Sequence, residues 1–326
     1  FVFMAGVYIH IPFCKQACYY CNFHFSTSKS LIKPLVEAIC KEASLRKQYL
    51  QEPVHTLYIG GGTPSLLGTE FLEKIINAVQ ENFSCGSLQE CTLEANPDDI
   101  SRAQLIAWKH LGIQRLSIGV QSVFDKELKS MNRSHSAMQA INSIKLALDA
   151  GFTNISVDLI YGSSTLSNEE WIETLQQIFS YNVSHLSCYA LTVEPKTALA
   201  HFIQHKKVPN VNAEKQAQQF ELLMRLTQQA GYEQYEISNF AKPGFYSKHN
   251  SSYWQQKSYI GLGPSAHSYN QFSRQWNIAN NALYIQSIQQ HKTVPFEIDY
   301  LTPVQQVNEY IMTSLRTAAR LSLKHI

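Results

Sequence analysis

Three cysteines that stand close together in the sequence could carry metal chemistry. Cys14, Cys18 and Cys21 are spaced four and three residues apart, directly after the apolar run 7–13. Cysteine thiolates hold iron–sulfur clusters, and a cubane cluster with only three local thiolates keeps one iron open to a small molecule. A structural zinc site favours four ligands in paired Cys-x2-Cys turns, and a disulfide fits poorly with a chain that opens without a secretory signal. The spacing therefore predicts a [4Fe–4S] cluster with one reactive iron.

Polar residues and glycines interrupt several apolar runs further along the chain. Glu94, Gln121 and Asp158 lie within or directly after such runs, where an unpaired carboxylate would be costly to bury. Any one of them could cap a loop or pair with an arginine such as Arg115, and the glycines at 60–62 alone mark only a tight turn. Gathered at one end of a sheet, they predict instead a pocket for a ligand with many polar groups, such as a nucleoside.

The elements that must position these residues follow a repeating pattern of a short apolar run, a loop and a helix. This alternation predicts an α/β fold with a parallel sheet and helices outside it. Apolar stripes at helical spacing mark the helices, and Gly112 and Gly151 stand where left-handed C-cap residues belong. Because active sites collect at the carboxyl ends of barrel strands, the unusual residues should converge on one pocket. The predicted strands cover residues 7–11, 56–59, 91–94, 115–120, 155–160 and 185–190.

Composition excludes several classes of function. A chain of 326 residues with 44% hydrophobic composition can bury a large core. Its 27 Lys and Arg against 25 Asp and Glu give a net charge of +2, which is too even to predict nucleic-acid binding. The sequence has no apolar run of the roughly 18 residues that a membrane span needs, so we expect a cytoplasmic protein. The other four cysteines are predicted to be buried, reduced thiols, namely Cys40, Cys85, Cys91 and Cys188.

The cysteine spacing, with Tyr20 before the third cysteine, resembles the signature of the radical S-adenosylmethionine (SAM) superfamily. Four further segments resemble oxygen-independent coproporphyrinogen III oxidases and their relatives, the heme chaperones of the HemW type. The resemblance covers the chain from about residue 7 to its end. The segments that carry it are residues 8–14, 60–65, 119–122 and 158–162.

The resemblance implies a fold, a domain division and a SAM site. Six β/α units are too few for a closed eight-stranded barrel, and the superfamily has an open (β/α)6 partial barrel, expected here over residues 4–235. Residues 236–326 would form an extension with the start of a helical, winged-helix-like domain, apparently truncated, whose helix begins near residue 301. Residues 213–231 are predicted to be helical, and 232–240 to add a strand. The residues that the resemblance assigns to SAM are Tyr8, Tyr20, Gly60, Gly61, Glu94, Gln121, Arg133, Asp158 and Ala190.

Two positions separate the two branches of this family. Coproporphyrinogen oxidases carry a further cysteine two residues after the third cluster cysteine, where this chain has Phe23. Residues 249–254 instead reproduce the HNxxYW motif that is associated with heme in the chaperone branch. In a polar stretch, this motif predicts a loop or strand edge from which His249 reaches a heme iron. Without the resemblance, a hydrogen-bonded aromatic patch on the barrel rim is the simpler interpretation.

Three functional hypotheses follow from this resemblance. The first is a heme chaperone that delivers heme to respiratory, membrane-associated acceptor proteins, as a possible homodimer that reaches the membrane only through a partner. The second is the anaerobic oxidase, in which a radical derived from SAM abstracts hydrogen beside a propionate carboxylate of coproporphyrinogen III. The third is a radical SAM enzyme with another substrate. The cofactors implied by the first hypothesis are a [4Fe–4S] cluster, SAM and heme.

Overall fold

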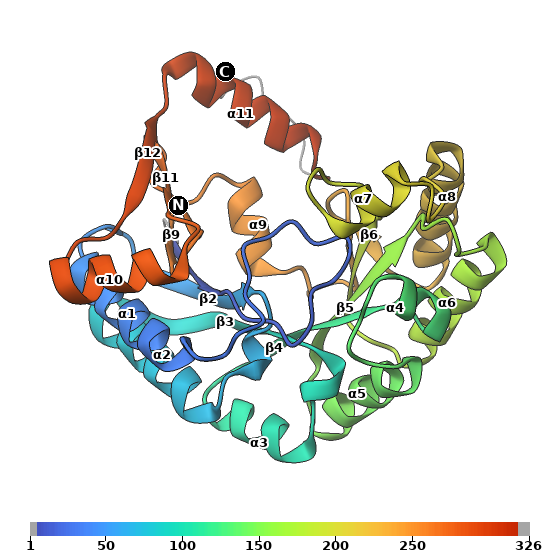
Figure 1. Cartoon of the computed structure of the whole chain (residues 1–326), viewed down its shortest axis with the longest axis horizontal. Helices are drawn as coiled ribbons and strands as arrows, with labels where there is room; N and C mark the ends of the chain where they lie inside the picture. The colour runs from blue at the N-terminus through green and yellow to red at the C-terminus, as the bar shows by residue number, and fades with distance from the viewer. Residues whose placement is uncertain (1–4, 319–326) are drawn as a thin grey trace.

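The computed structural model describes residues 5–318. A single sheet runs through this part of the chain in the order β12-β11-β10-β9-β1-β2-β3-β4-β5-β6-β8-β7. Its parallel centre, β1 to β6, curves into an open barrel with helices on the outside (Figure 1), which confirms the predicted α/β partial barrel. The central strands are β1 (Ala5–Ile11), β2 (Val54–Gly61), β3 (Cys85–Ala95), β4 (Arg115–Gln121), β5 (Asn154–Tyr161) and β6 (His185–Ala190).

The helices form where apolar stripes and capping residues predict them. Ser136 and Ser167 each start a helix with a capping box, and Gly112 and Gly151 follow helix ends with φ of 81° and 79°. A left-handed residue there satisfies the last helical carbonyls. The helices around the barrel are α1 (Ile32–Leu45), α2 (Thr69–Asn82), α3 (Arg102–His110), α4 (Asp125–Ser130), α5 (Ala137–Asp149), α6 (Asn168–Ser180), α7 (Ala198–Gln204) and α8 (Ala213–Gln229).

The alternation of side chains along the strands separates an apolar shell from a polar barrel interior. In β4, Leu116, Ile118 and Val120 are fully buried in the apolar core beneath the helices. Successive side chains of a strand point to opposite faces, so Arg115 and Ser117 point into the barrel. The barrel interior is therefore a polar chamber rather than a second hydrophobic core.

Short strands extend the sheet at both edges. β9 (Tyr259–Leu262) pairs with β1 in parallel, and antiparallel strands follow it. At the other edge the predicted strand 232–240 is wrong in detail, because the chain forms two short antiparallel strands there. Their pairing crosses the predicted boundary between residues 235 and 236. The remaining strands are β7 (Glu233–Gln234), β8 (Asn239–Ala241), β10 (His267–Tyr269), β11 (Ser273–Asn277) and β12 (Phe296–Tyr300).

Helix α11 (Pro303–Leu315) crosses the open side of the barrel (Figure 1). Just beyond it, the Ala318 amide donates to the carbonyl of Tyr235 at 3.0 Å, so the segment that leaves β12 reaches the opposite edge of the sheet. The helix predicted from residue 301 is confirmed as far as α11, and residues 319–326 lie outside the described range. No helix in the described part of the chain is long and apolar enough to span a membrane.

The four cysteines outside the Cys14–Cys21 loop do not all have the predicted environment. Cys91 and Cys188 are buried, as predicted. Cys40 and Cys85 are only half-buried, which corrects the prediction for them, and their thiols contact the carbonyl oxygens of Lys74 and Val79. All seven cysteines of the chain are free thiols.

Candidate functional site

The three clustered cysteines lie on one loop at the carboxyl end of β1. The Cys14 amide donates to the carbonyl of Ser26 at 3.0 Å, and the Cys21 amide donates to the carbonyl of Cys18 at 3.3 Å, so the loop folds back on itself. Burial raises the pKa of the Cys14 thiol to about 11, and the charges of Cys18 and Cys21 act in the same direction. Within residues 5–318, no three Cys, His, Asp or Glu side chains are arranged to hold a single metal ion. A cubane binds each thiolate at a separate iron.

Arg133 connects this loop to the ends of the central strands. Its Nη1 donates to Cys18 Sγ at 3.4 Å and to the Tyr20 hydroxyl at 3.5 Å. Its Nη2 donates to the carbonyl of Gly119 at 3.0 Å and to the amide oxygen of Asn96. The buried Nε has no hydrogen-bond partner among the described residues. A guanidinium held in this way can offer a donor to a carboxylate ligand beside the cysteine loop.

The Glu94 carboxylate lies against Gly60 and Gly61 at the end of β2, which accounts for the absence of a side chain at Gly60. Its Oε1 accepts from the Tyr58 hydroxyl at 2.8 Å, and its Oε2 accepts from the Gly61 amide at 3.0 Å. A Cβ on Gly60 would lie only 2.9 Å from Glu94 Oε1, so a larger residue there would displace the carboxylate. Burial raises the pKa of Glu94 to about 7, and the half-buried side chain faces the barrel interior. Such a group can bind a polar ligand at the barrel mouth.

Asp158 occupies the equivalent place on β5. Its carboxylate accepts from Ser117 Oγ at 3.1 Å and from Ser156 Oγ at 3.3 Å. Burial raises its pKa to about 6, and the nearby Arg115 guanidinium opposes that rise. The charge of Asp158 adds to the rise in the pKa of Glu94, and burial and the charges of both carboxylates raise the pKa of Tyr58. The structure therefore brings the two predicted carboxylates to one chamber.

The other predicted residues at this end form the rim of the same chamber. Gln121 ends β4 with φ of 65°, in the left-handed region that non-glycine residues rarely adopt. Such outliers persist where the surroundings require them, often at ligand sites. The Tyr8 hydroxyl lies 3.0 Å from His10 Nδ1, and Ala190 ends β6 opposite Tyr161. The positions assigned to SAM therefore converge at the carboxyl ends of the strands.

The HNxxYW motif forms a helix, α9 (Lys248–Trp254), so the predicted loop or strand edge is wrong. Ser247 provides the N-cap, and the Glu90 carboxylate accepts from the amides of Lys248 at 2.9 Å and His249 at 3.0 Å. A carboxylate at a helix N-terminus satisfies free N–H groups and the helix dipole. Glu90 is 2% exposed inside the barrel, so α9 is anchored to its interior.

The His249 side chain is buried between α9 and strand β2. It is 1% exposed, and its ring stacks on Tyr58 at a centroid distance of 5.1 Å. Its Nδ1 lies 2.8 Å from Thr56 Oγ1, and its Nε2 lies 2.6 Å from the Tyr253 hydroxyl. Both ring nitrogens are engaged, so the heme ligation predicted for His249 would require the nitrogen that binds the iron to give up its hydrogen bond.

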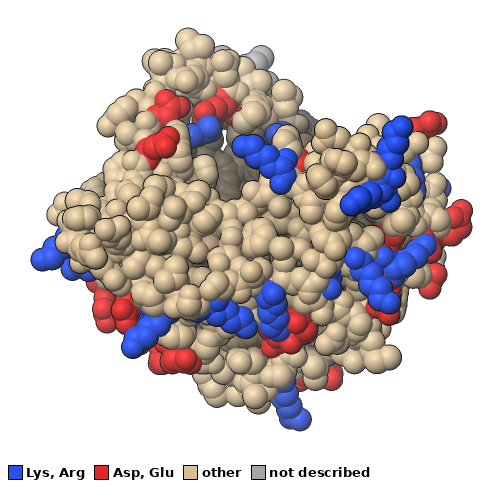
Figure 2. All heavy atoms as spheres, in the orientation of Figure 1, with Lys and Arg blue, Asp and Glu red and all other residues tan. Residues whose placement is uncertain are grey.

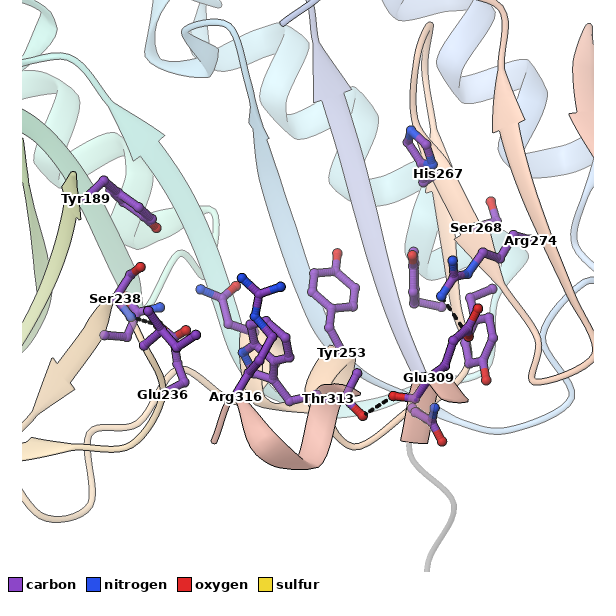
Figure 3. A pocket seen from close by; sticks show the side chains of 17 residues that line it. Tyr189, Glu236, Ser238, Tyr253, His267, Ser268, Arg274, Glu309, Thr313 and Arg316 are labelled. Carbon is purple, nitrogen blue, oxygen red and sulfur yellow. Dashed lines mark hydrogen bonds and ion pairs between the residues drawn. The ribbon is translucent and has the colours of Figure 1, made fainter. Parts of the chain in front are cut away.

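A cavity of about 540 Å³ lies beside this motif, at the open side of the barrel. Figure 2 shows the surface hollowed below α11, with basic and acidic side chains at its edge. Figure 3 shows Tyr253 standing in the middle of the lining, between Tyr189 on one side and His267 on the other. Sequence reasoning missed the two arginines of this lining, Arg274 and Arg316, because no motif contains them.

Buried histidines make the stability of this site sensitive to acid. Burial lowers the pKa of His249 to about 3, so the folded protein resists its protonation. A base with a depressed pKa contributes stability that is present above pH 6.5 and is lost as pH falls towards the folded value. We expect H249F to take up about one proton fewer on unfolding at pH 5 than the wild type.

This expectation is checked by the slope of unfolding free energy against pH between 6.5 and 4. The matched control is H110Q, because His110 is exposed on α3 and its replacement should leave the slope unchanged. An unchanged slope in H249F would show that His249 is protonated in the folded state.

Comparison with known proteins places this arrangement in a family. A family model described as the radical SAM superfamily matches residues 8–178, which contain the end of β1, the cysteine loop and strands β2 to β5. The heme chaperone HemW of Bacillus subtilis (strain 168) is 35% identical over 332 residues, which cover 98% of this chain and 86% of that protein. HemW of Escherichia coli (strain K12) is 36% identical over 265 residues, which cover 80% and 69%.

A solved structure shares the fold. Coproporphyrinogen III oxidase (HemN) from Escherichia coli, described as a radical SAM enzyme, matches with a TM-score of 0.84 at 23% identity. The match covers 97% of this chain and 76% of that chain. The chain therefore belongs to the radical SAM superfamily and, within it, to the HemW family of coproporphyrinogen III oxidase-like proteins.

Proposed function

We propose that this protein is a heme chaperone, which binds heme and passes it to acceptor proteins. The observation that carries the proposal is the similarity to proteins named heme chaperone over most of the chain. The cavity at the open side of the barrel supports it, because the HNxxYW helix supplies Asn250, Tyr253 and Trp254 to its lining. The acceptors would be respiratory proteins at the membrane, and a cytoplasmic, homodimeric chaperone would associate with them.

In the same proposal, an iron–sulfur cluster and SAM bind at the mouth of the barrel. When bound, the cluster would supply an electron to SAM at its open iron. Cys14, Cys18 and Cys21 would hold the cluster, since their thiols are free and share one loop. Arg133 would donate to the SAM carboxylate, and Glu94 would accept from a polar group of SAM. The half-buried carboxylates of Glu94 and Asp158 at the end of the barrel fit such a ligand.

We expect substitution of Glu94 or Asp158 to weaken SAM binding. Each carboxylate already has hydrogen-bond donors from the protein, so it is oriented before the ligand arrives. Losing one hydrogen-bonding group typically costs about 1–3 kcal/mol, or roughly 5- to 150-fold in affinity. Calorimetric titration of E94Q and D158N with SAM measures the effect, with the cluster spectrum as a check on folding. E70Q on α2 is the control, because that carboxylate lies outside the chamber.

Phe23 favours the chaperone over the oxidase. Its side chain is 71% exposed, at the position where the oxidases carry a further cysteine. We expect no detectable conversion of coproporphyrinogen III when reconstituted protein is incubated anaerobically with SAM and reductant. The same preparation, loaded with heme, should transfer heme to a heme-free acceptor. Robust turnover without heme retention would favour the oxidase, and cleavage of SAM that depends on neither compound would favour an enzyme with another substrate.

A further inference from the structure

The two faces of the β10–β11 hairpin contact different parts of the protein. Ser268 Oγ and Gln275 Oε1 accept from Arg46, which directly follows α1, at 3.3 and 2.7 Å, so their side chains are directed at the outer helices, although Ser268 also borders the cavity. Side chains alternate along a strand, so His267 and Arg274 belong to the opposite face, and both line the cavity. The hairpin register therefore presents an imidazole and a guanidinium to the open side of the barrel.

His267 differs from the other histidines near the barrel in the state of its ring nitrogens. Neither nitrogen makes a hydrogen bond within the described part of the chain, whereas both nitrogens of His10 and of His249 are engaged. The ring stacks on its cross-strand partner Trp276 at a centroid distance of 6.2 Å, which orients it. Burial, and then the charge of Arg274, lower the pKa of His267. The lowered pKa favours the neutral imidazole, which has a lone pair available to a metal.

Two arginines stand on different elements around the same cavity. Arg274 Nη2 pairs with Glu309 Oε2 of α11 at 2.7 Å. Arg316, at the end of α11, lies over the Trp254 ring at 5.8 Å from its centroid. Figure 3 shows both side chains with His267 in the lining. Arginine forks match carboxylates, and aromatic faces suit a flat apolar ring.

We propose that heme binds in this cavity with His267 as the axial ligand of its iron and with Arg274 and Arg316 as partners of its two propionates. This assignment rests on the proposed function, and it moves the iron ligand away from His249. The cavity of about 540 Å³ lies within the range of roughly 300–1,000 Å³ that organic ligands occupy. Tyr253 and Trp254 of the HNxxYW helix then form an aromatic wall for the macrocycle, while His249 supports that wall through the Tyr253 hydroxyl.

The test is hemin titration of purified protein, followed by the Soret band. H267A should shift the band and bind hemin at least about tenfold more weakly, since losing even a supporting group of a metal ligand costs that much. Added imidazole should restore the wild-type Soret position in H267A, because it can fill the vacated space. H291Q, with an exposed histidine at the end of α10 (Asn281–His291), is the control and should match the wild type.

The propionate contacts have a separate test. R274Q should weaken hemin binding several-fold and leave the binding of hemin dimethyl ester unchanged, because the ester lacks both carboxylates. Equal losses for hemin and its ester would overturn the role of Arg274.

The outcomes separate this assignment from the proposed function. Wild-type protein that fails to retain heme overturns the proposed function and this assignment with it. Wild-type protein that binds heme, with an unaltered Soret band in H267A and a lost band in H249F, overturns the assignment alone. Circular dichroism and SAM binding of each variant show that its fold is intact.

Discussion

Replacing any one of Cys14, Cys18 or Cys21 by alanine is expected to abolish the broad visible absorption of the reconstituted [4Fe–4S] cluster. The three thiols share one loop at the carboxyl end of β1, and Arg133 contacts Cys18 directly. Two remaining thiolates cannot replace the third, because each one binds its own iron corner. Iron and sulfide analysis together with the absorption spectrum of each variant measures the loss.

The matched control is C40A, because Cys40 is a half-buried thiol on α1 whose Sγ donates to the carbonyl of Lys74, away from the cysteine loop. Its cluster spectrum should equal that of the wild type. Equal loss in C40A would contradict the three-cysteine site. The fold of the triple variant should survive, since the apolar core under the helices includes none of the three cysteines. Its circular dichroism spectrum and unfolding midpoint check this expectation.

The elements predicted correctly are those that local patterns determine. Each central strand is an apolar run bounded by turn residues, and each of the long helices α1, α2, α5, α6 and α8 has a stripe at helical spacing. The short helices α4 and α7 have no such stripe and were not predicted. Strand β10 escaped prediction, and β7 and β8 were predicted as a single strand over residues 232–240, because these three strands contain only two or three residues each. Runs of that length have no measurable period, and only pairing with a neighbouring strand defines them.

The environment of His249 could not be predicted from local sequence. Its hydrogen-bond partner Thr56 is 193 residues away in the chain, and Glu90, which caps α9, is 159 residues away. The motif predicted an exposed histidine because its neighbours are polar. Those polar residues instead face a polar barrel interior, which strand alternation creates and which no single segment reveals.

Glu42 and Arg46 were also missed, although the sequence contains a signal for them. They continue the apolar stripe of Leu35 and Ile39 on the buried face of α1. A charge at such a position requires a partner when it is buried. Here Glu42 Oε1 accepts from Arg46 Nη1 at 3.2 Å, and both residues are directed at the strands that follow β9.

The largest loss of stability is expected from E42Q. The Glu42 side chain is fully buried, and both of its oxygens accept hydrogen bonds from the far edge of the sheet. The Gly263 amide and Asn277 Nδ2 donate at 2.8 Å each, and the Tyr284 hydroxyl donates as well. Glutamine has only one acceptor oxygen, so its amide nitrogen would face hydrogen-bond donors. Arg46 would also lose the negative charge with which it pairs.

Breaking a buried ion pair on one side typically costs about 3–5 kcal/mol, which is a large share of the roughly 5–15 kcal/mol that stabilises a native protein. Urea unfolding of E42Q measures the change, and E37Q on the exposed face of the same helix is the control. Because Glu42 and Arg46 anchor the segments that carry His267 and Arg274, E42Q should also loosen the wall of the cavity and weaken hemin binding. Wild-type stability in E42Q would mean that the strands beyond β9 are held by their backbone pairing alone.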